Sequence, residues 1–360
     1  MDEKDGTVGS RTRKKTKNTK RKPILITLAV ILAIIIGGIT VWAVGIYNGI
    51  NDLSKSEFEP LFPSLEPEEV VEVPVWEGKE RVNILLLGVD ARDQQPGELA
   101  RSDSMLVASI DPVTKKAHLF SILRDTYLPI EGHGRGRINT AITLGRPELA
   151  MKTAGDLLGL DIQYYVYTDF EGFKALIDTI GGIYFEVEKN MRYTDNADGN
   201  RYDINLDKGY QLLDGDKALQ YVRFRHDKMS DFTRTERQRN FLMAVAKELK
   251  STWNIVKMKE ILDSIKPYVH MNITPADILK LGQLGLDLSI AGSAQVPPMH
   301  LIADEKINGV GSVLAVTSIE RVQQYVQEIL AADESALEET DPNSNTATED
   351  ANSTGTSQTN

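Results

Sequence analysis

Residues 82–90 read VNILLLGVD, and this stretch decides the fold. An almost wholly apolar run that stops at Gly88 is typical of a strand buried on both faces of a sheet. Two further apolar runs follow at 105–110 and 117–123, separated by a turn that begins at Asp111. The three runs predict strands of one central sheet.

Helical and extended patterns alternate after these strands. The sequence predicts a helix at 148–158, a strand at 164–167, a helix at 170–180 that two glycines end, and a strand at 184–187. Amphipathic patterns predict three more helices at 255–265, 275–286 and 318–330. Strands interleaved with helices indicate an α/β fold whose central, mainly mixed β-sheet is flanked by helices on both faces.

An apolar segment near the N-terminus predicts one transmembrane helix. No charged side chain occurs between residues 23 and 51, and this run is long enough to cross the roughly 30 Å hydrocarbon layer of a bilayer. Residues 1–22 carry nine Lys or Arg against three acidic residues, so the positive-inside rule places them in the cytoplasm. A cleaved signal peptide is the alternative, but its apolar run is usually only about 7 to 15 residues long.

Composition divides the rest of the chain and excludes some functions. The net charge of −11 argues against a nucleic-acid partner, and the absence of cysteine excludes disulfides and thiolate metal sites. We expect a cytoplasmic basic tail at 1–22, a transmembrane helix at 23–47, an extracellular stalk at 48–80, one extracellular domain at 81–331, and a disordered acidic and polar tail at 332–360.

Five arginines gather in residues 221–239 of this acidic chain, with three acidic residues among them. Guanidinium groups at that density suit a multiply charged anion, because each donates two parallel hydrogen bonds to phosphate oxygens. Arg223 and Arg225 share one face if the chain there is extended, whereas Arg234 and Gln238 project from one side of a helix that a capping box at Thr233 begins. The pattern therefore predicts a phosphate or pyrophosphate pocket.

An ordinary charged helix face is the competing interpretation of this cluster. It stays open for Arg239. It is disfavoured for Arg234 and Arg237, because the arginines exceed what pairing between residues four apart requires.

Acidic residues at two predicted strand ends suggest a metal. Asp90 follows the first strand and Asp103 precedes the second, and Mg²⁺ prefers one or two carboxylates together with substrate phosphate oxygens. Each aspartate on its own is more often a turn or cap residue. Arg124 and Asp125 end the third strand at the same edge, where a surface ion pair is the alternative.

Five motifs, in this order and spacing, resemble the LytR-CpsA-Psr family over residues 81 to about 250. They are Gly88-Val89-Asp90, Arg101-Ser102-Asp103-Ser104, Ser121-Ile122-Leu123-Arg124-Asp125-Thr126, Arg137-Ile138-Asn139, and Tyr221-Val222-Arg223-Phe224-Arg225 with Asp231, Arg234, Arg237 and Gln238. The chain departs from the family at Leu123, where members commonly have Pro, and at Arg137, where they often have Lys. Both departures keep the charged pattern.

The resemblance implies an enzyme of bacterial, mainly Gram-positive, envelopes. Such enzymes move an anionic glycopolymer from a polyprenyl pyrophosphate carrier to peptidoglycan, and they enclose the lipid in an apolar channel between sheet and helices. By matching position, Asp90 and Asp103 are expected to bind Mg²⁺, with Mn²⁺ as a substitute. The residues expected to hold the pyrophosphate oxygens are Arg101, Arg124, Arg223, Arg225, Arg234 and Gln238, to which the arginine cluster adds Arg237.

The expected reaction is attack by a muramic acid hydroxyl on the phosphorus nearer the glycopolymer. Catalysis of this kind is mostly positioning and charge neutralisation, in which Arg124 takes part. Asp231 is the preferred general base and Asp125 the alternative, and either can instead orient an arginine. A membrane-tethered binding or regulatory protein and a pyrophosphate hydrolase are the rival functions.

Overall fold

The computed structural model describes residues 21–54, 76–90, 101–194, 199–200, 202–225 and 230–338, with side chains omitted for 21–35, 230 and 333–338. The chain forms two compact units, residues 1–47 and residues 48–360. Of the predicted basic tail at 1–22, stalk at 48–80 and acidic tail at 332–360, residues 1–20, 55–75 and 339–360 lie outside the described residues. The predictions for these residues stay predictions. Residues 48–54 and 332–338 are helical.

The described part of the first unit belongs to helix α1 (Arg21–Ser54), whose last residues enter the second unit. Among the residues that the structure describes, no helix combines the length and the apolar character needed to cross a membrane. The predicted span at 23–47 includes residues 23–35, whose side chains lie outside the description. The transmembrane helix therefore stays a prediction.

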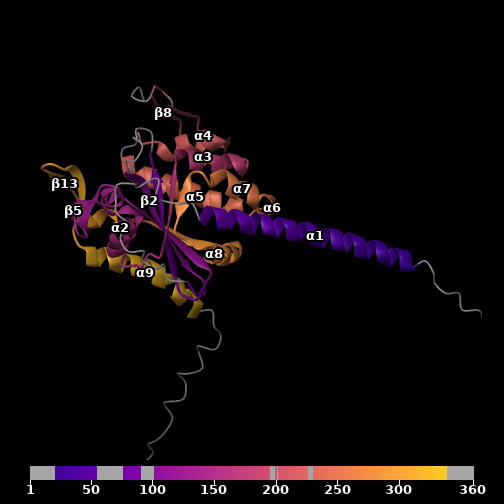
Figure 1. The fold of residues 1–360 in the computed structure, drawn as a ribbon. Coiled ribbons are helices and arrows are strands. Elements are labelled where there is room, and N and C mark those ends of the chain that lie inside the picture. The colour runs from indigo at the N-terminus through magenta and orange to yellow at the C-terminus, as the bar shows by residue number, and fades with distance from the viewer. Residues whose placement is uncertain are drawn as a thin grey trace, which may run out of the picture. The chain divides into compact units, whose positions relative to one another are not determined.

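A six-stranded sheet forms the centre of the second unit (Figure 1). Strand β1 (Val82–Val89) pairs parallel with β6 (Tyr164–Asp169) and antiparallel with β2 (Ser102–Asp111), so the sheet is mixed, as predicted. The strand order is β11 (Val269–Met271), β6, β1, β2, β3 (Lys116–Ile122) and β12 (Ser289–Val296). The predicted strands at 82–87, 105–110, 117–123 and 164–167 are confirmed within these bounds.

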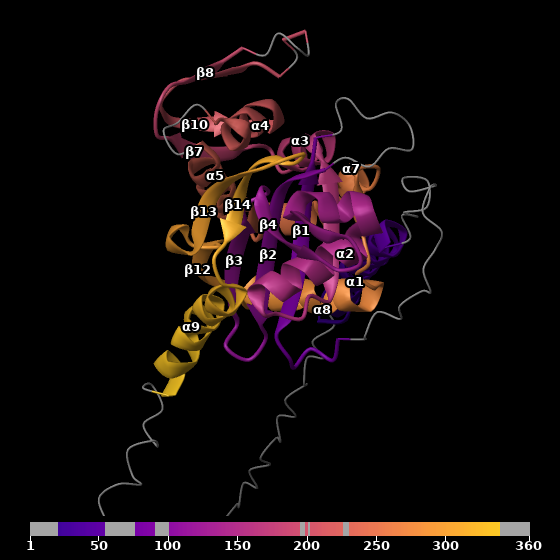
Figure 2. The ribbon, with the colours of Figure 1, turned by 90° about the vertical axis from the view of Figure 1, so that its left-hand side faces the viewer.

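Helices cover both faces of this sheet. Helices α2 (Ala141–Leu158) and α9 (Ile319–Glu338) contribute to the buried cluster on one face, and α2 crosses in front of the central strands in Figure 2. The opposite face carries α3 (Phe170–Thr179), α4 (Gly215–Arg223), α5 (Ser230–Leu249), α7 (Met258–Ile265) and α8 (Pro275–Asp287). The α/β fold with helices on both faces is therefore confirmed.

Three smaller sheets were not anticipated. One joins β13 (Ile302–Ile307), β14 (Gly311–Val316), β4 (Thr126–Ile130) and β5 (Gly134–Arg137). The others are two-stranded: β7 (Ile183–Val187) with β10 (Gly209–Leu213), and β8 (Met191–Tyr193) with β9 (Ile204–Leu206). The predicted strand at 184–187 exists as β7, but it pairs with β10 and not with the central sheet.

Two helix predictions need correction. The helix predicted at 255–265 is two helices, α6 (Thr252–Val256) and α7, because Lys257 adopts φ −82° and ψ 7° between them. The capping box at Thr233 is wrong, because α5 begins at Ser230 and Thr233 lies inside it. Asp231 stands in its first turn, where an acidic side chain suits the helix dipole.

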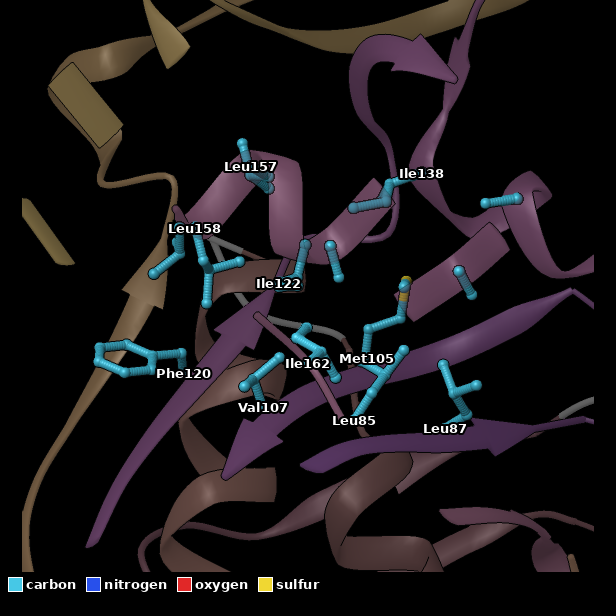
Figure 3. Packing of buried hydrophobic residues seen from close by; sticks show 14 of the residues in the cluster. Leu85, Leu87, Met105, Val107, Phe120, Ile122, Ile138, Leu157, Leu158 and Ile162 are labelled. Atoms are coloured by element: carbon cyan, nitrogen blue, oxygen red, sulfur yellow. The ribbon is translucent and has the colours of Figure 1, made fainter. Parts of the chain in front are cut away.

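The strand period of two separates the two faces of β1. Leu85, Leu87 and Val89 point into a cluster with α2, which Figure 3 shows together with Met105 and Phe120. Ile84 points the other way and packs at one end of the sheet with Trp76 and Tyr164. The rest of that second face, from Leu86 to Gly88, lines the candidate site.

Candidate functional site

A cavity of about 530 Å³ lies between the second face of the sheet and the helices that cover it. Its floor is built in register. Leu86 of β1 lies opposite Leu106 of β2 and Val166 of β6, and one step along the strands Gly88 lies opposite Ser104 and Thr168. The apolar row sits deeper along the strands, and the small and polar row leads to the strand end at Asp90.

Apolar side chains from the helices, with strands β8 and β9, form the other walls. They come from α3 (Phe170, Phe173, Leu176), α4 (Leu219, Val222), α5 (Phe241, Leu242), α7 (Ile265), β8 (Tyr193) and β9 (Ile204). Gly172 of α3 is needed for the close approach of helix and sheet, because a Cβ there would lie 2.4 Å from Oγ1 of Thr168. The lining is therefore largely apolar and suits a hydrocarbon chain.

The opposite end of the same cavity is charged. Six of the predicted site residues line it, namely Asp90, Asp103, Arg223, Arg225, Arg234 and Gln238. They come from β1, β2, α4, the extended segment after α4, and α5, which are far apart in the sequence. The structure thus brings the acidic pair to one place with Gln238 and three of the five arginines of the cluster.

Arg124, directly after β3, connects the acidic residues of this end. Its Nη1 donates a hydrogen bond to Asp103, and its Nε lies 3.5 Å from Asp125 Oδ2 and 3.7 Å from Asp231 Oδ2. Burial alone would lower the pKa of Arg124, but these three carboxylates together raise it. Arg124 therefore stays a fixed positive charge among three acids.

Asp231 is shared by three arginines. Its Oδ1 lies 3.4 Å from Arg234 Nη2 and 3.7 Å from Arg225 Nε, while its Oδ2 faces Arg124. The side chain of Arg234 is only 2% exposed, so its direction is fixed by packing. Asp231 thus holds three guanidinium groups together beside the cavity.

Arg225 experiences the positive charge of Arg124 directly. Its pKa is lowered by burial, and the neighbouring Arg124 lowers it further, although Asp231 and Asp103 act in the opposite direction. A group that is both buried and beside a like charge is stabilised when a negative ligand binds. The electrostatics therefore favour an anionic ligand next to Arg225.

Arg223 is held between two aromatic rings. Its guanidinium carbon lies 5.1 Å from the ring centroid of Phe170 and 5.1 Å from that of Tyr202, and its Nη1 donates to the Tyr202 carbonyl at 3.2 Å. The two rings are in edge contact, with centroids 5.9 Å apart, so Arg223 rests in the angle between them and these cation–π contacts restrict its direction. No sequence pattern pointed to Tyr202, which lies some twenty residues before Arg223.

Arg101 and Arg237, two of the arginines assigned to the pyrophosphate, lie outside the described cavity lining. Arg237 lies outside the described cavity lining, where its Nε pairs with Glu188 at 2.6 Å and its Nη1 donates to the Phe224 carbonyl at 3.0 Å. Arg101 is exposed at the start of β2, also outside that lining. Their assignments to the pyrophosphate stay predictions.

Arg239 corrects one interpretation. Its side chain is buried and donates to Oγ of Ser121 on β3. The ordinary charged helix face, left open for this residue, is therefore wrong, because the guanidinium faces the sheet.

Further contacts made by motif residues support the site. Ser104 donates from its Oγ to the Gln238 side chain at 3.1 Å and joins β2 to α5. Asp125 lies 3.4 Å from Nε of Arg137, whose Nη2 donates to the carbonyls of Val310 and Ser312 at 2.8 and 2.9 Å. Arg137 thus ties β5 to β14 and steadies Asp125, which faces Arg124.

The donor set can be compared with the preferences of Mg²⁺. Among the described residues, no group of three or more His, Cys, Asp or Glu side chains has the arrangement of a metal site. Asp90 and Asp103 supply two carboxylates that line the same cavity. Mg²⁺ commonly takes one or two carboxylates and completes its shell with water and substrate phosphates, so this pair fits a substrate-bound ion.

Comparisons with known proteins agree with this geometry. The model of the LytR_cpsA_psr family matches residues 47–328. The chain is 34% identical over 327 residues to the polyisoprenyl-teichoic acid–peptidoglycan teichoic acid transferase TagU of Oceanobacillus iheyensis, covering 84% of this chain and 97% of that relative. It is also 33% identical over 258 residues to the regulatory protein MsrR of Staphylococcus aureus, covering 69% of this chain and 75% of MsrR.

A solved structure is similar as well. TagT, crystallised with a bound octaprenyl pyrophosphate lipid, superposes with a TM-score of 0.53 at 25% identity, covering 71% of this chain and 92% of TagT.

Proposed function

The chain belongs to the LytR-CpsA-Psr family, and from this premise we propose that it transfers an anionic glycopolymer from a polyprenyl pyrophosphate carrier to a muramic acid hydroxyl of peptidoglycan, forming a phosphodiester. The cavity carries this proposal, because one end is apolar and the other is lined by four donors and two carboxylates. An isoprenoid chain and a diphosphate are the two halves of one such donor. The names of TagU and TagT's ligand support the same substrate class.

The reaction is a phosphoryl transfer in which one bond forms and one breaks. The acceptor hydroxyl oxygen bonds to the phosphorus nearer the glycopolymer, and the bridging oxygen between the two phosphorus atoms leaves with polyprenyl phosphate. The hydroxyl proton passes to a carboxylate. Arg223, Arg225 and Arg234 hold the charged oxygens as negative charge moves to the leaving group.

Asp90 and Asp103 would hold a Mg²⁺ ion, which would neutralise charge on the diphosphate when bound. Arg124 keeps Asp103 in place through their hydrogen bond. The arginines do the rest of the neutralisation, because each charge-assisted hydrogen bond contributes about 1.5 to 3 kcal/mol.

Asp231 is the residue to which we assign the hydroxyl proton. It belongs to the first turn of α5 and lies within 3.7 Å of two arginines and 3.4 Å of a third, so its position is fixed beside Arg225 and Arg234 of the cavity lining. Asp125 lies on the other side of Arg124 and is tied to Arg137, which suits an orienting role. Asp231→Asn should lower kcat with little change in KM, whereas an orienting role alone would raise KM.

The N-terminal apolar segment at 23–47 anchors this domain in the cell membrane, with the N-terminus in the cytoplasm and the catalytic domain outside. The nine basic residues before the segment support this orientation. An anchored domain meets a membrane-bound donor on the side of the bilayer where peptidoglycan lies.

The proposal is tested by donor turnover. Purified full-length protein with Mg²⁺ and a polyprenyl pyrophosphate-linked glycopolymer should release polyprenyl phosphate only when a peptidoglycan acceptor is present. Val166→Phe should fill the apolar floor and weaken donor binding about tenfold, with the fold intact, because the added volume enters an existing cavity. Val107→Phe is the matched control, because Val107 is buried in the packed cluster on the other face.

Two rivals predict different results. Tight donor binding without turnover would indicate a regulatory or binding protein, a possibility raised by the name of MsrR. Equal turnover with and without acceptor would indicate a hydrolase that uses water. Either result would contradict the transferase.

A further inference from the structure

We propose that the surface formed by Trp253 and Val256 of α6 lies in the interface of an anionic lipid bilayer, so that the domain rests on the membrane beside its anchor. This inference rests on the proposed membrane anchor. It concerns a surface on the outside of the domain, separate from the charged end of the cavity.

Both side chains are presented outward by a fixed helix. Trp253 is 64% exposed and Val256 is 56% exposed, and their spacing of three puts them on one side of α6. Asn254 between them is fully buried and donates from Nδ2 to the Glu248 carbonyl at 2.9 Å, while Ser251 caps the helix. The outward direction of the two apolar side chains is therefore set by the fold.

Lysine is frequent in the sequence on both sides of this apolar pair. Residues 247–266 contain five lysines and three acidic residues, although the chain as a whole is acidic. The ammonium of Lys257 lies 5.2 Å from the ring centroid of Trp253. This ammonium lies over the ring. Tryptophan with a lysine beside it is a combination found where proteins meet lipid headgroups, because the ring takes the apolar side and a lysine can reach anionic phosphates.

The first residues of the second unit pack against α7, the helix that follows α6. Ile50 and Leu53, in the last turn of α1, are buried, and a Cβ on Gly49 would lie 3.3 Å from Leu262 of α7. Asp52 pairs with Lys266 at the end of α7 at 3.2 Å. Helix α7 directly follows α6 and contacts it, so Trp253 and Val256 belong to the helix pair against which the first residues of the second unit pack.

The cavity reaches the same helix pair. Ile265 of α7 belongs to its apolar lining. A bilayer in contact with α6 and α7 would therefore lie near the apolar part of the cavity, which is where a polyprenyl chain has to enter. This gives the surface a use in donor loading as well as in orientation.

The experiment uses the full chain in nanodiscs that contain phosphatidylglycerol. Because the chain has no cysteine, Val256→Cys introduces a single site for a spin label. Met299→Cys is the matched control, since Met299 is 55% exposed. Met299 follows the C-terminal end of β12. Lys250 contacts the carbonyl of Leu288 at the other end of this strand, and the eight residues of β12 separate the two ends by roughly 26 Å.

We expect the label at 256 to collide several-fold more often with dissolved oxygen than with a water-soluble nickel complex, and the label at 299 to show the reverse. A water-like label at 256 would overturn the proposal. Dipolar broadening between labels at 256 in detergent would also overturn it, because it would assign the surface to a second copy of the chain.

Donor turnover measured on the same variants separates this inference from the proposed function. Normal turnover with a water-like label at 256 would refute only the docking surface. A membrane-immersed label without turnover would refute only the transferase.

Discussion

The two faces of the central sheet are made by alternate residues of the same strands, yet one is packed and the other is hollow. Leu85, Leu87 and Val89 of β1 are buried against α2, and no more than 1% of any of them is exposed. Leu86 and Gly88, between them in sequence, form the floor of a cavity of about 530 Å³. The difference separates two tasks, because the packed face stabilises the fold and the hollow face holds the ligand.

Phe120 gives the largest expected effect. It is fully buried on the packed face, so Phe120→Ala should lower the free energy of unfolding by about 3 to 5 kcal/mol. The matched control is Phe173→Ala in the cavity wall, which should cost only about 1 kcal/mol but weaken donor binding. Urea unfolding measures both, and equal losses of stability would break the comparison between the faces.

Arg124 gives the next effect, on activity. Arg124→Ala should lower kcat/KM about 100-fold or more, because three carboxylates lose their shared cation and Asp103 loses its hydrogen bond. Arg124→Lys keeps the charge and should recover part of the rate. Arg237→Ala, outside the described cavity lining, should lower stability more than turnover, and a reversed ranking would move the anion site toward Arg237.

Asp277 gives the next effect, on stability, at the end of the second face where Tyr164 lies. It is fully buried and accepts hydrogen bonds from Tyr164 at 2.8 Å and Lys280 at 2.9 Å, and Asp277→Asn should cost about 1 to 3 kcal/mol at pH 7. Burial alone would raise the pKa of Asp277, but Lys280, Tyr164 and Thr274 together hold it below its usual value.

The direction of that shift fixes the pH dependence. Because the folded pKa is lower than the unfolded value of about 3.9, the stability from Asp277 is present above that pH and is lost as the pH falls through the folded pKa. The difference in stability between the native chain and Asp277→Asn should therefore shrink below about pH 4. A difference independent of pH would refute the role of its charge.

Tyr202 gives the smallest effect. Tyr202→Ala removes one of the two rings that hold Arg223, and we expect a loss of about tenfold in kcat/KM. Tyr202→Phe keeps the ring and should restore most of the rate. If the hydroxyl had a purely structural role that caused the effect, Tyr202→Phe would not restore the rate. A full loss in Tyr202→Phe would assign the effect to its hydrogen bond with Glu171.

Continuous apolar runs made the central sheet predictable. The run at 82–87 required burial on both faces, and the structure has β1 there. The smaller sheets escaped prediction because strands such as β5, with sequence Gly-Arg-Gly-Arg, carry no apolar alternation. The break at Lys257 was missed because the apolar period continues across it, although the backbone turns.

The charged end of the cavity was predictable because motifs fixed its residue types, and six of them line one cavity. Which arginine faces the cavity was not predictable. Arg234 and Arg237 are three apart on the same helix, yet Arg234 meets Asp231 and Arg237 meets Glu188, which comes from the segment after β7. Pairing with a strand outside the central sheet leaves no trace in local sequence.

The register of β1 limits how this protein can change. Inserting or deleting one residue before Leu86 would turn Leu85 or Leu87 toward the ligand and move Leu86 into the packed cluster. The binding chamber can therefore be reshaped by exchanging side chains at fixed positions, but not by lengthening its strands one residue at a time. Adaptation to a longer or bulkier lipid is confined to the helices above the floor, where a shift of one element leaves the other face untouched.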